Sequence, residues 1–374
     1  MAEQKLTHIV GTFLIQAEGA FLNGAGLDDS GEDRNAVIPK TFQDGRYRVP
    51  YVSSQAWRRW LRETFKEEYP NEPKAELKAL SKNARGNPDK IGTEMDPVMF
   101  PEDDIFGYMR AEKGQGRAKA EDEDEDATIA EAEAEEAAPK GKQKGSKTRA
   151  VMRPSPFSSS ILKSIRTTGW QGDDEGFVHL KEGSPLPYKT RFYNTQLQGI
   201  FGLGYDRLGT FRNEGDRIEL DEALVSKYLK EEVIEKDADR EIYRVKNNRR
   251  RERATMILRS LAVLRGGAKQ AQFGTDVTPK VIILAGLNCG NLIFNDLFEE
   301  KDLQPVLKLA TLQQIIADYQ NRLMTPVFIG LRDGYLHPEN EREVKEWAKN
   351  NTQVRLLSPV KAVEKLTDSL KDLA

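Results

Sequence analysis

The chain has 374 residues, and 38% of them are hydrophobic, which is enough for a buried core in one large domain or two ordinary ones. Its 57 basic and 60 acidic residues give a formal net charge of −3, but residues 121–136, EDEDEDATIAEAEAEE, are almost purely acidic. The rest of the chain is therefore basic, and a nucleic-acid partner is not excluded. A single cysteine, Cys289, excludes a disulfide framework and a cysteine-based zinc site. Without a long apolar run or a signal-peptide pattern, we expect a cytoplasmic protein that does not enter a membrane.

The N-terminal segment predicts a strand, a loop, a second strand and a helix. Residues 5–19, KLTHIVGTFLIQAEG, carry apolar side chains on both faces of a strand and predict a central position in a sheet. Residues 23–35 are rich in glycine, asparagine and aspartate, which predicts a loop. The run RYRVPYV then predicts a strand that leads into a helix, beginning at Ser53 or Ser54 and ending near Tyr69, before Pro70.

The middle of the chain is interrupted by a polar insertion. Residues 112–149 are charged, rich in alanine and poor in aliphatic residues, so we predict a disordered, solvated surface loop rather than an electrostatic mimic of nucleic acid. Beyond it, TRFYNTQLQGIFGLGYDRLGTF predicts one or two long strands, NNRRRERATMILRSLAVLRGG a helix and VIILAG a buried strand. The resulting order βαββαβ predicts an α+β fold with a ferredoxin-like or RRM-like sheet. After residue 290 we expect two helices, the strand VRLL and a last helix from Pro359.

The helix after Ser53 combines tryptophans with arginines. On a helical wheel its apolar side chains share one arc and its arginines the opposite arc. The apolar arc holds Trp57, Trp60, Leu61 and Phe65, and the cationic arc holds Arg58, Arg59 and Arg62. An ordinary amphipathic surface helix has the same pattern. However, no acidic residue stands four positions before these arginines, and Ser53 and Ser54 place hydroxyls at the helix start, where phosphate is favoured.

A second basic segment, residues 243–270, contains nine lysines and arginines and a single acidic residue, Glu252. A solvated helix face accounts for its arginines equally well. The stretch GGAKQ at its end is more specific, because paired glycines let a backbone approach a polyanion closely. Within it, Lys269 supplies a charge and Gln270 an amide.

Other chemistries have weaker support. His8, His179 and His337 lie far apart without the spacing of metal ligands, and no RNP1 motif is present, so we do not expect a standard RRM with stacked aromatic residues. GLGYDRLG lacks the spacing of a dinucleotide loop. We therefore expect no metal and no cofactor.

Carboxylates in the first loop leave one catalytic alternative open. Asp28, Asp29 and Asp33 could coordinate Mg²⁺ for cleavage of a phosphodiester. A polar turn is the interpretation that we favour.

Taken together, VSSQAWRRWLR and GGAKQ resemble the backbone subunit of CRISPR type I surveillance complexes (Cascade), a member of the RAMP superfamily. The stretches most similar to the DevR-type subunits of subtype I-B are NGAGLDDSGEDRNAVIP, PYVSSQAWRRWLRE, RPSPFSSSIL and LRGGAKQAQFGTDVTPKVIILAG. The resemblance covers most of the chain apart from residues 70–149, and the acidic insertion departs from the family pattern.

The resemblance implies a modified RRM-like palm with a helical fingers insertion and a β-hairpin thumb. It assigns 1–69 and 151–290 to the two parts of the palm, 70–150 to the fingers, about 166–192 to the thumb and 291–374 to a C-terminal extension of the palm. It implies a non-catalytic subunit that polymerises head to tail along the spacer of a guide RNA (crRNA) and grips its backbone. Target DNA and other Cascade subunits are the further partners that it implies.

By residue correspondence, the implied RNA-binding positions are Ser53, Ser54, Gln55, Arg58, Arg59, Arg62, Arg166, Gly267, Lys269 and Gln270. Two alternatives stay open. One is a metal-dependent RNase of the type III backbone kind that uses Asp28 or Asp29. The other is a stand-alone RNA-binding regulator.

Overall fold

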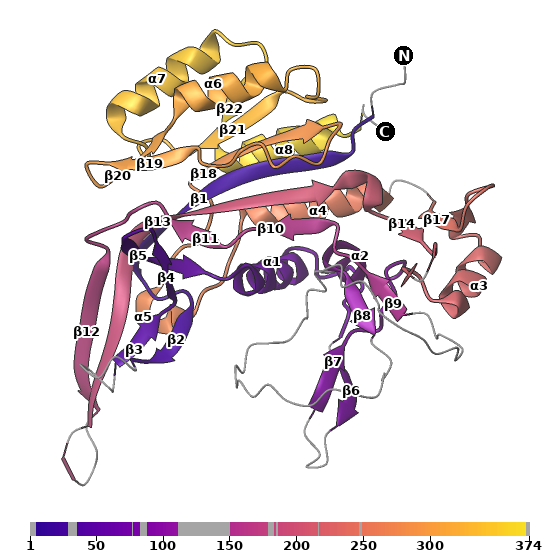
Figure 1. Ribbon diagram of the computed structural model, residues 1–374, viewed down its shortest axis with the longest axis horizontal. Coiled ribbons are helices and arrows are strands. Elements are labelled where there is room, and N and C mark those ends of the chain that lie inside the picture. The colour runs from indigo at the N-terminus through magenta and orange to yellow at the C-terminus, as the bar shows by residue number, and fades with distance from the viewer. Residues whose placement is uncertain are drawn as a thin grey trace, which may run out of the picture. The chain divides into compact units, whose positions relative to one another are not determined.

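A computed structural model describes residues 5–28, 36–76, 78–82, 88–110, 150–178, 183–184, 186–215, 217–246 and 249–371. The chain divides into two compact units (Figure 1). The first comprises Met1–Tyr69, Ser158–Leu203 and Ala254–Ala374, and the second comprises Pro70–Phe157 and Gly204–Arg253. The predicted disordered loop at 112–149 lies outside the described residues. Within the described residues, no helix is long and apolar enough to cross a membrane.

The first unit contains the predicted βαββαβ order. Its elements are β1 (His8–Ala20), α1 (Ser54–Glu68), β11 (Leu162–Ser164), β13 (Leu186–Gly204), α4 (Arg249–Ala262) and β18 (Val281–Leu287), except that Gly204 of β13 and the residues of α4 up to Arg253 fall in the second unit. Its strands lie side by side as β18-β1-β13-β11, with the two strands flanking the second helix on either side of β1. The α+β, RRM-like prediction is therefore confirmed.

The sheet continues beyond these four strands. On one side it adds β21 (Val327–Leu331), antiparallel to β18, and β22 (Val354–Leu357), parallel to β21. On the other side it adds β5 (Tyr47–Val52) and β4 (Thr41–Asp44). Four more strands belong to the same sheet. Strands β3 (Ala36–Pro39), β10 (Phe157–Ser159) and β12 (Gln171–Val178) each pair with β13, and β2 (Gly24–Leu27) pairs with β3.

Both faces of β1 are covered, as its apolar sequence predicted. On one face, the ring centroid of Phe13 lies 5.5 Å from that of Trp57 in α1. On the other, Val10 and Leu14 join a buried cluster. That cluster includes residues of β18, β21, α6 (Leu309–Asp318) and α7 (Pro338–Lys349). The last helix, α8 (Pro359–Ser369), lies against β21, where a Cβ on Gly330 would be 2.5 Å from the Cα of Pro359.

An antiparallel hairpin projects from this sheet where the thumb was predicted. It is formed by β12 and by residues 186–193 of β13, with Gln171 opposite Tyr193 and Val178 opposite Leu186. We call this hairpin the arm. Figure 1 shows it extending away from the sheet, with β2, β3 and the short α5 (Gln270–Phe273) beside it.

The second unit is built from small sheets and short helices. Its strands are β6 (Lys78–Lys82), β7 (Pro88–Gly92), β8 (Tyr108–Arg110), β9 (Ala150–Arg153), β14 (Thr210–Arg212), β15 (Arg217–Ile218), β16 (Ile234–Lys236) and β17 (Ile242–Val245). Its helices are α2 (Pro101–Phe106), α3 (Glu222–Lys230) and the 3₁₀ turn η1 (Tyr205–Arg207). Gly204–Arg253, which the sequence analysis placed in the palm, thus joins the region predicted as fingers. Where the structure describes residues 70–150, α2 is the only helix.

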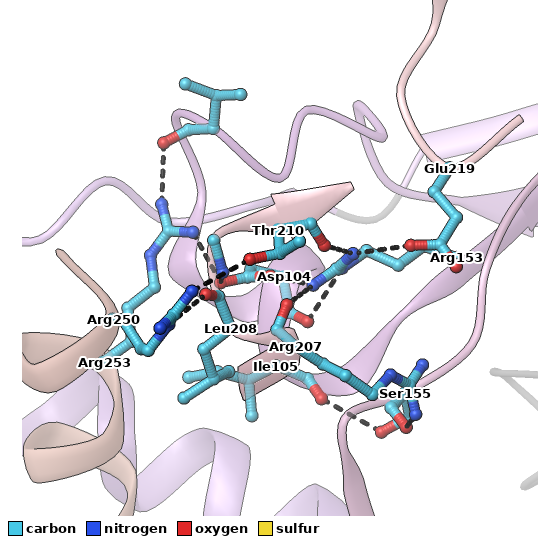
Figure 2. Close-up of polar contacts among 12 residues, drawn as sticks. Asp104, Ile105, Arg153, Ser155, Arg207, Leu208, Thr210, Glu219, Arg250 and Arg253 are labelled. Carbon is cyan, nitrogen blue, oxygen red and sulfur yellow. Dashed lines mark hydrogen bonds and ion pairs between the residues drawn. The ribbon is translucent and has the colours of Figure 1, made fainter. Parts of the chain in front are cut away.

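Buried charges hold the two segments of the second unit together (Figure 2). The carboxylate of Asp104 accepts hydrogen bonds from Arg153 and, at 2.5 Å, from Nη1 of Arg253. Arg153 also donates to Glu219 at 3.1 Å and to the carbonyl of Thr210 at 3.0 Å. Because Asp104 and Arg153 come from the first segment and the others from the second, charge-assisted hydrogen bonds join the segments.

Candidate nucleic-acid interface

The start of α1 is built as a capped helix terminus. Ser53 is the N-cap, and its Oγ accepts a hydrogen bond from the amide of Ala56 at 3.3 Å. Ser54 is half-buried and Gln55 is exposed in the first turn, all of whose residues are described and none of which is acidic. The positive end of the helix dipole is therefore not offset by a carboxylate in that turn, and an anion is favoured there.

The prediction that α1 exposes a cationic face is wrong for two of its three arginines. Arg58 and Arg62 are each only 8% exposed, whereas Arg59 is exposed. Strand β10 covers the side of the helix that carries Arg58, whose Nη1 donates to the Oγ of Ser159 at 3.3 Å. The neighbouring Trp57 donates its indole N–H to the carbonyl of Ser160 at 2.7 Å. Arg59 is thus the one exposed arginine of this set.

The apolar arc of α1 is buried as predicted, with one exception. Trp57 and Leu61 are fully buried and Phe65 is 1% exposed. Trp60 is half-buried and lies against the backbone of Gly266, where a Cβ would collide with the indole. This contact explains why the chain has glycine at that position.

Residues 266–270, the glycine loop, adopt a conformation that requires glycine. Gly267 has φ +111°, and a Cβ there would lie 2.5 Å from Cδ2 of Leu22. Lys269 is in the left-handed region, and its Nζ donates to Oγ1 of Thr190 in the arm at 2.8 Å. Gln270 folds back so that its amide donates to the carbonyl of Gly266. The loop is therefore fixed to the arm through Lys269.

The start of α1 and the glycine loop meet at two consecutive residues that follow β1. The carbonyl of Leu22 accepts a hydrogen bond from the amide of Ala268 at 3.0 Å. Oδ1 of Asn23 accepts one from the amide of Ser53, also at 3.0 Å. The amide of Leu22 donates to the hydroxyl of Tyr193 at 3.3 Å, and burial raises the pKa of that phenol. Residues 22 and 23 thus join helix, loop and arm.

A second link ties α1 to the residues just before the loop. The hydroxyl of Thr64 accepts from the amide of Arg265 at 3.0 Å, across 201 positions of sequence. Composition did not indicate Asn23, Thr64 or Thr190 as members of the site. The one usable signal was the run rich in glycine, asparagine and aspartate at residues 23–35, which predicted a loop; Gly24–Leu27 of that run form the strand β2 instead.

Arg166 lies at the base of the arm and is 8% exposed. Its Nε donates to Glu300 at 2.8 Å, and its Nη1 donates to the carbonyls of Gly169 at 3.2 Å and Asn194 at 3.1 Å. Its guanidinium therefore has three acceptors within the chain.

One of the aspartates of the RNase alternative, Asp28, pairs with a residue of the arm. Asp28 is buried, and its carboxylate lies 3.5 Å from Nη1 of Arg191 in the arm. Asp29 and Asp33 lie outside the described residues, as does His179. Among the residues that are described, no group of three or more His, Cys, Asp or Glu side chains is placed to hold a metal ion.

Comparison with known proteins gives a fold but no family. No protein-family model matches the sequence, and no curated protein does. A solved chain described as "CRISPR RNA-guided surveillance complex, pre-nicking" aligns with 97% of this chain and 100% of its own length, with a TM-score of 0.53 and 10% identity. A second, described as "CRISPR RNA-guided surveillance complex", has the same coverage, a TM-score of 0.48 and 12% identity. At such identities the likeness concerns the fold alone.

Proposed function

We propose that the protein is a non-catalytic, RNA-binding backbone subunit of a CRISPR type I surveillance complex (Cascade), similar to the DevR-type subunits of subtype I-B. In this role it binds the backbone of a guide RNA (crRNA) and presents the guide for pairing with a target DNA strand. Copies of the chain assemble head to tail along the spacer, together with other Cascade subunits. The fold that it shares with a chain of an RNA-guided surveillance complex supports this assignment.

The observation that carries the proposal is the meeting of the start of α1 and the glycine loop at Leu22 and Asn23. The helix start contributes hydroxyl donors and a positive dipole end, Arg59 an exposed charge on the same helix, and Lys269 a charge on the loop. Phosphate contacts of this kind position a strand without reading its sequence. The site therefore suits a guide whose sequence varies.

RNA binding can be tested by replacing the two cationic side chains of the proposed site, Arg59 and Lys269. Arg59→Ala and Lys269→Ala should each weaken binding of two unrelated single-stranded RNAs by the same factor. Each should reduce the log–log salt slope by roughly 0.7 for every phosphate that the variant no longer neutralises. Arg342→Ala is the matched control, because Arg342 is also an exposed arginine on a helix, α7, whose buried Val344 belongs to the cluster on the other face of β1. Fluorescence anisotropy at several salt concentrations gives both quantities.

Two results would overturn the proposal. One is a wild-type protein that binds neither RNA at low salt. The other is a wild-type protein that binds both RNAs while Arg59→Ala and Lys269→Ala behave as Arg342→Ala does. Loss of binding to one sequence only would mean that these side chains read bases.

Absence of RNA cleavage is part of the proposal. The pairing of Asp28 with Arg191 supports it, because a cation at 3.5 Å competes with a metal ion for the same carboxylate. Complementary RNA hybridised to bound guide should stay intact in Mg²⁺ or Mn²⁺. Cleavage that Asp28→Ala abolishes would establish the RNase alternative instead.

Assembly on RNA separates a Cascade subunit from a stand-alone regulator. Mass photometry on guides of increasing length should show complexes whose mass grows stepwise with RNA length. A single copy bound at every length would favour the regulator.

A further inference from the structure

The arm leaves the sheet at a large bulge. Ser164 of β11 lies opposite Leu197 of β13, and Gln171 of β12 lies opposite Tyr193. Between these pairs the outer chain has six residues, 165–170, whereas β13 has three, 194–196. Extra residues on one strand interrupt the ladder and bend it, so the direction of the arm is set where the bulge is held.

The side chain of Arg166 bonds to both strands of this bulge. Its Nη1 donates to the carbonyl of Gly169 on the bulged strand at 3.2 Å and to that of Asn194 on β13 at 3.1 Å. Its own backbone is tied down by Ser164, whose Oγ donates to the carbonyl of Arg166 at 2.7 Å and accepts from its amide at 3.1 Å. A bulge leaves backbone carbonyls without ladder partners, and the forked guanidinium supplies donors to both sides of this one.

A third element fixes the same guanidinium. Its Nε donates at 2.8 Å to Glu300, which lies on β19 (Phe298–Lys301) of the hairpin that β19 forms with β20 (Gln304–Leu307). That hairpin is anchored in the core, where Phe298 is 4% and Leu307 is 1% exposed. The amide of Leu307 also donates to Oδ1 of Asn340 in α7 at 2.8 Å. Glu300 is therefore held on a rigid support.

We propose that Arg166 is a positioning residue that closes the bulge and, through Glu300, fixes the direction in which the arm leaves the sheet. Other bonds hold the base of the arm, among them the indole N–H of Trp170 to the carbonyl of Arg48 at 3.1 Å. Arg166 differs from these because it joins both strands of the bulge to the core through one side chain. The inference does not rest on the proposed function, since its test contains no RNA.

The test measures the direction of the arm directly. Spin labels are attached to Ser184→Cys, an exposed position between the two strands of the arm, and to Glu343→Cys, an exposed position on α7, after Cys289→Ser removes the single native thiol. Double electron–electron resonance then gives the distance distribution between the labels. Arg166→Ala, Glu300→Ala and their combination are compared with Lys308→Ala. That control removes a neighbouring ion pair, Lys308 Nζ to Asp296 at 2.9 Å.

Both alanine variants should shift the mean distance and broaden the distribution, while Lys308→Ala leaves it unchanged. The double variant should do no more than the larger single change, because paired residues are not additive. Arg166→Lys should change the distance distribution less than Arg166→Ala does, since an ammonium keeps the charge but lacks the several planar N–H donors of a guanidinium. An unchanged distribution in both alanine variants would overturn the inference. If Arg166→Ala does not fold, Glu300→Ala decides by the same criterion.

Discussion

Removal of the Asp104 carboxylate tests how the second unit is held together. Asp104 is fully buried, and it accepts hydrogen bonds from Arg153 and Arg253 and, at 2.9 Å, from the amide of Gly209. Asp104→Ala leaves the two buried guanidinium groups with less negative charge and leaves that amide without its acceptor. Breaking a buried ion pair from one side costs about 3–5 kcal/mol in the free energy of unfolding.

A matched control separates this effect from the loss of any ion pair. Asp237 in the same unit pairs with Arg244 at 3.0 Å, but both side chains are partly exposed. Exposed pairs contribute roughly 0–1 kcal/mol, because water already solvates both charges. Asp237→Ala should therefore change the stability of the second unit far less than Asp104→Ala does.

The distribution of tryptophans lets one experiment report on each unit. All four tryptophans of the chain lie in the first unit, at positions 57, 60, 170 and 347. Urea unfolding followed by tryptophan fluorescence reports on the first unit, whereas far-ultraviolet circular dichroism reports on both. Asp104→Ala should lower the urea concentration at the midpoint of the dichroism transition. The midpoint of the fluorescence transition should stay close to that of the wild type. A loss no larger than that of Asp237→Ala would refute the reasoning.

Two further predictions concern the first unit. Leu61→Ala should lower the stability seen by tryptophan fluorescence by about 2–5 kcal/mol, because Leu61 is fully buried beside Trp57; a loss below about 1 kcal/mol would contradict its place in the core. Gly267→Ala should cost more than Gly274→Ala, although both glycines have positive φ. A Cβ on Gly267 would lie 2.5 Å from Leu22, whereas at Gly274 no described atom comes within 4 Å. Equal melting temperatures of the two alanine variants would contradict this.

Periodic segments could be predicted closely from the sequence. The helix expected from Ser53 or Ser54 to about Tyr69 is α1, Ser54–Glu68, and the strand expected at 281–286 is β18, Val281–Leu287. The cap and apolar periodicity of α1 and the continuous apolar run of β18 are local signals, so both can be recognised without the rest of the chain. By contrast, β21, VFIGL, was missed, because its apolar run stops at Gly330 after three residues, fewer than the roughly four to eight that mark a buried strand.

Associations between distant segments could not be predicted in the same way. A helical wheel gives the angle of Arg58 on α1, but it does not show that Ser159, 101 positions later, covers that angle. Similarly, Arg253 bonds to Asp104 across 149 positions, and the helical pattern around Arg253 does not indicate that partner. The charged run around Arg253 predicted an exposed face, either solvated or bound to nucleic acid, whereas this arginine is 2% exposed and serves the interior of the second unit.

The position of the candidate site follows from the topology of the sheet rather than from either motif. Strand β18 runs antiparallel to β1, with Leu14 opposite Val281, so the residues that precede β18 come to the end of β1 where the chain leaves it. The glycine loop precedes β18 and lies at this end of β1, where the amide of Ala268 donates to the carbonyl of Leu22. What can bind where helix, loop and arm meet then depends on two residues of the loop, Gly267 with its positive φ and Lys269 with its charge. A slip of the β1–β18 register by one residue would exchange the two faces of β1 and place Phe13 where Val10 and Leu14 pack, so the burial of different side chains on each face fixes the register. The same burial thereby fixes the place at which helix, loop and arm meet.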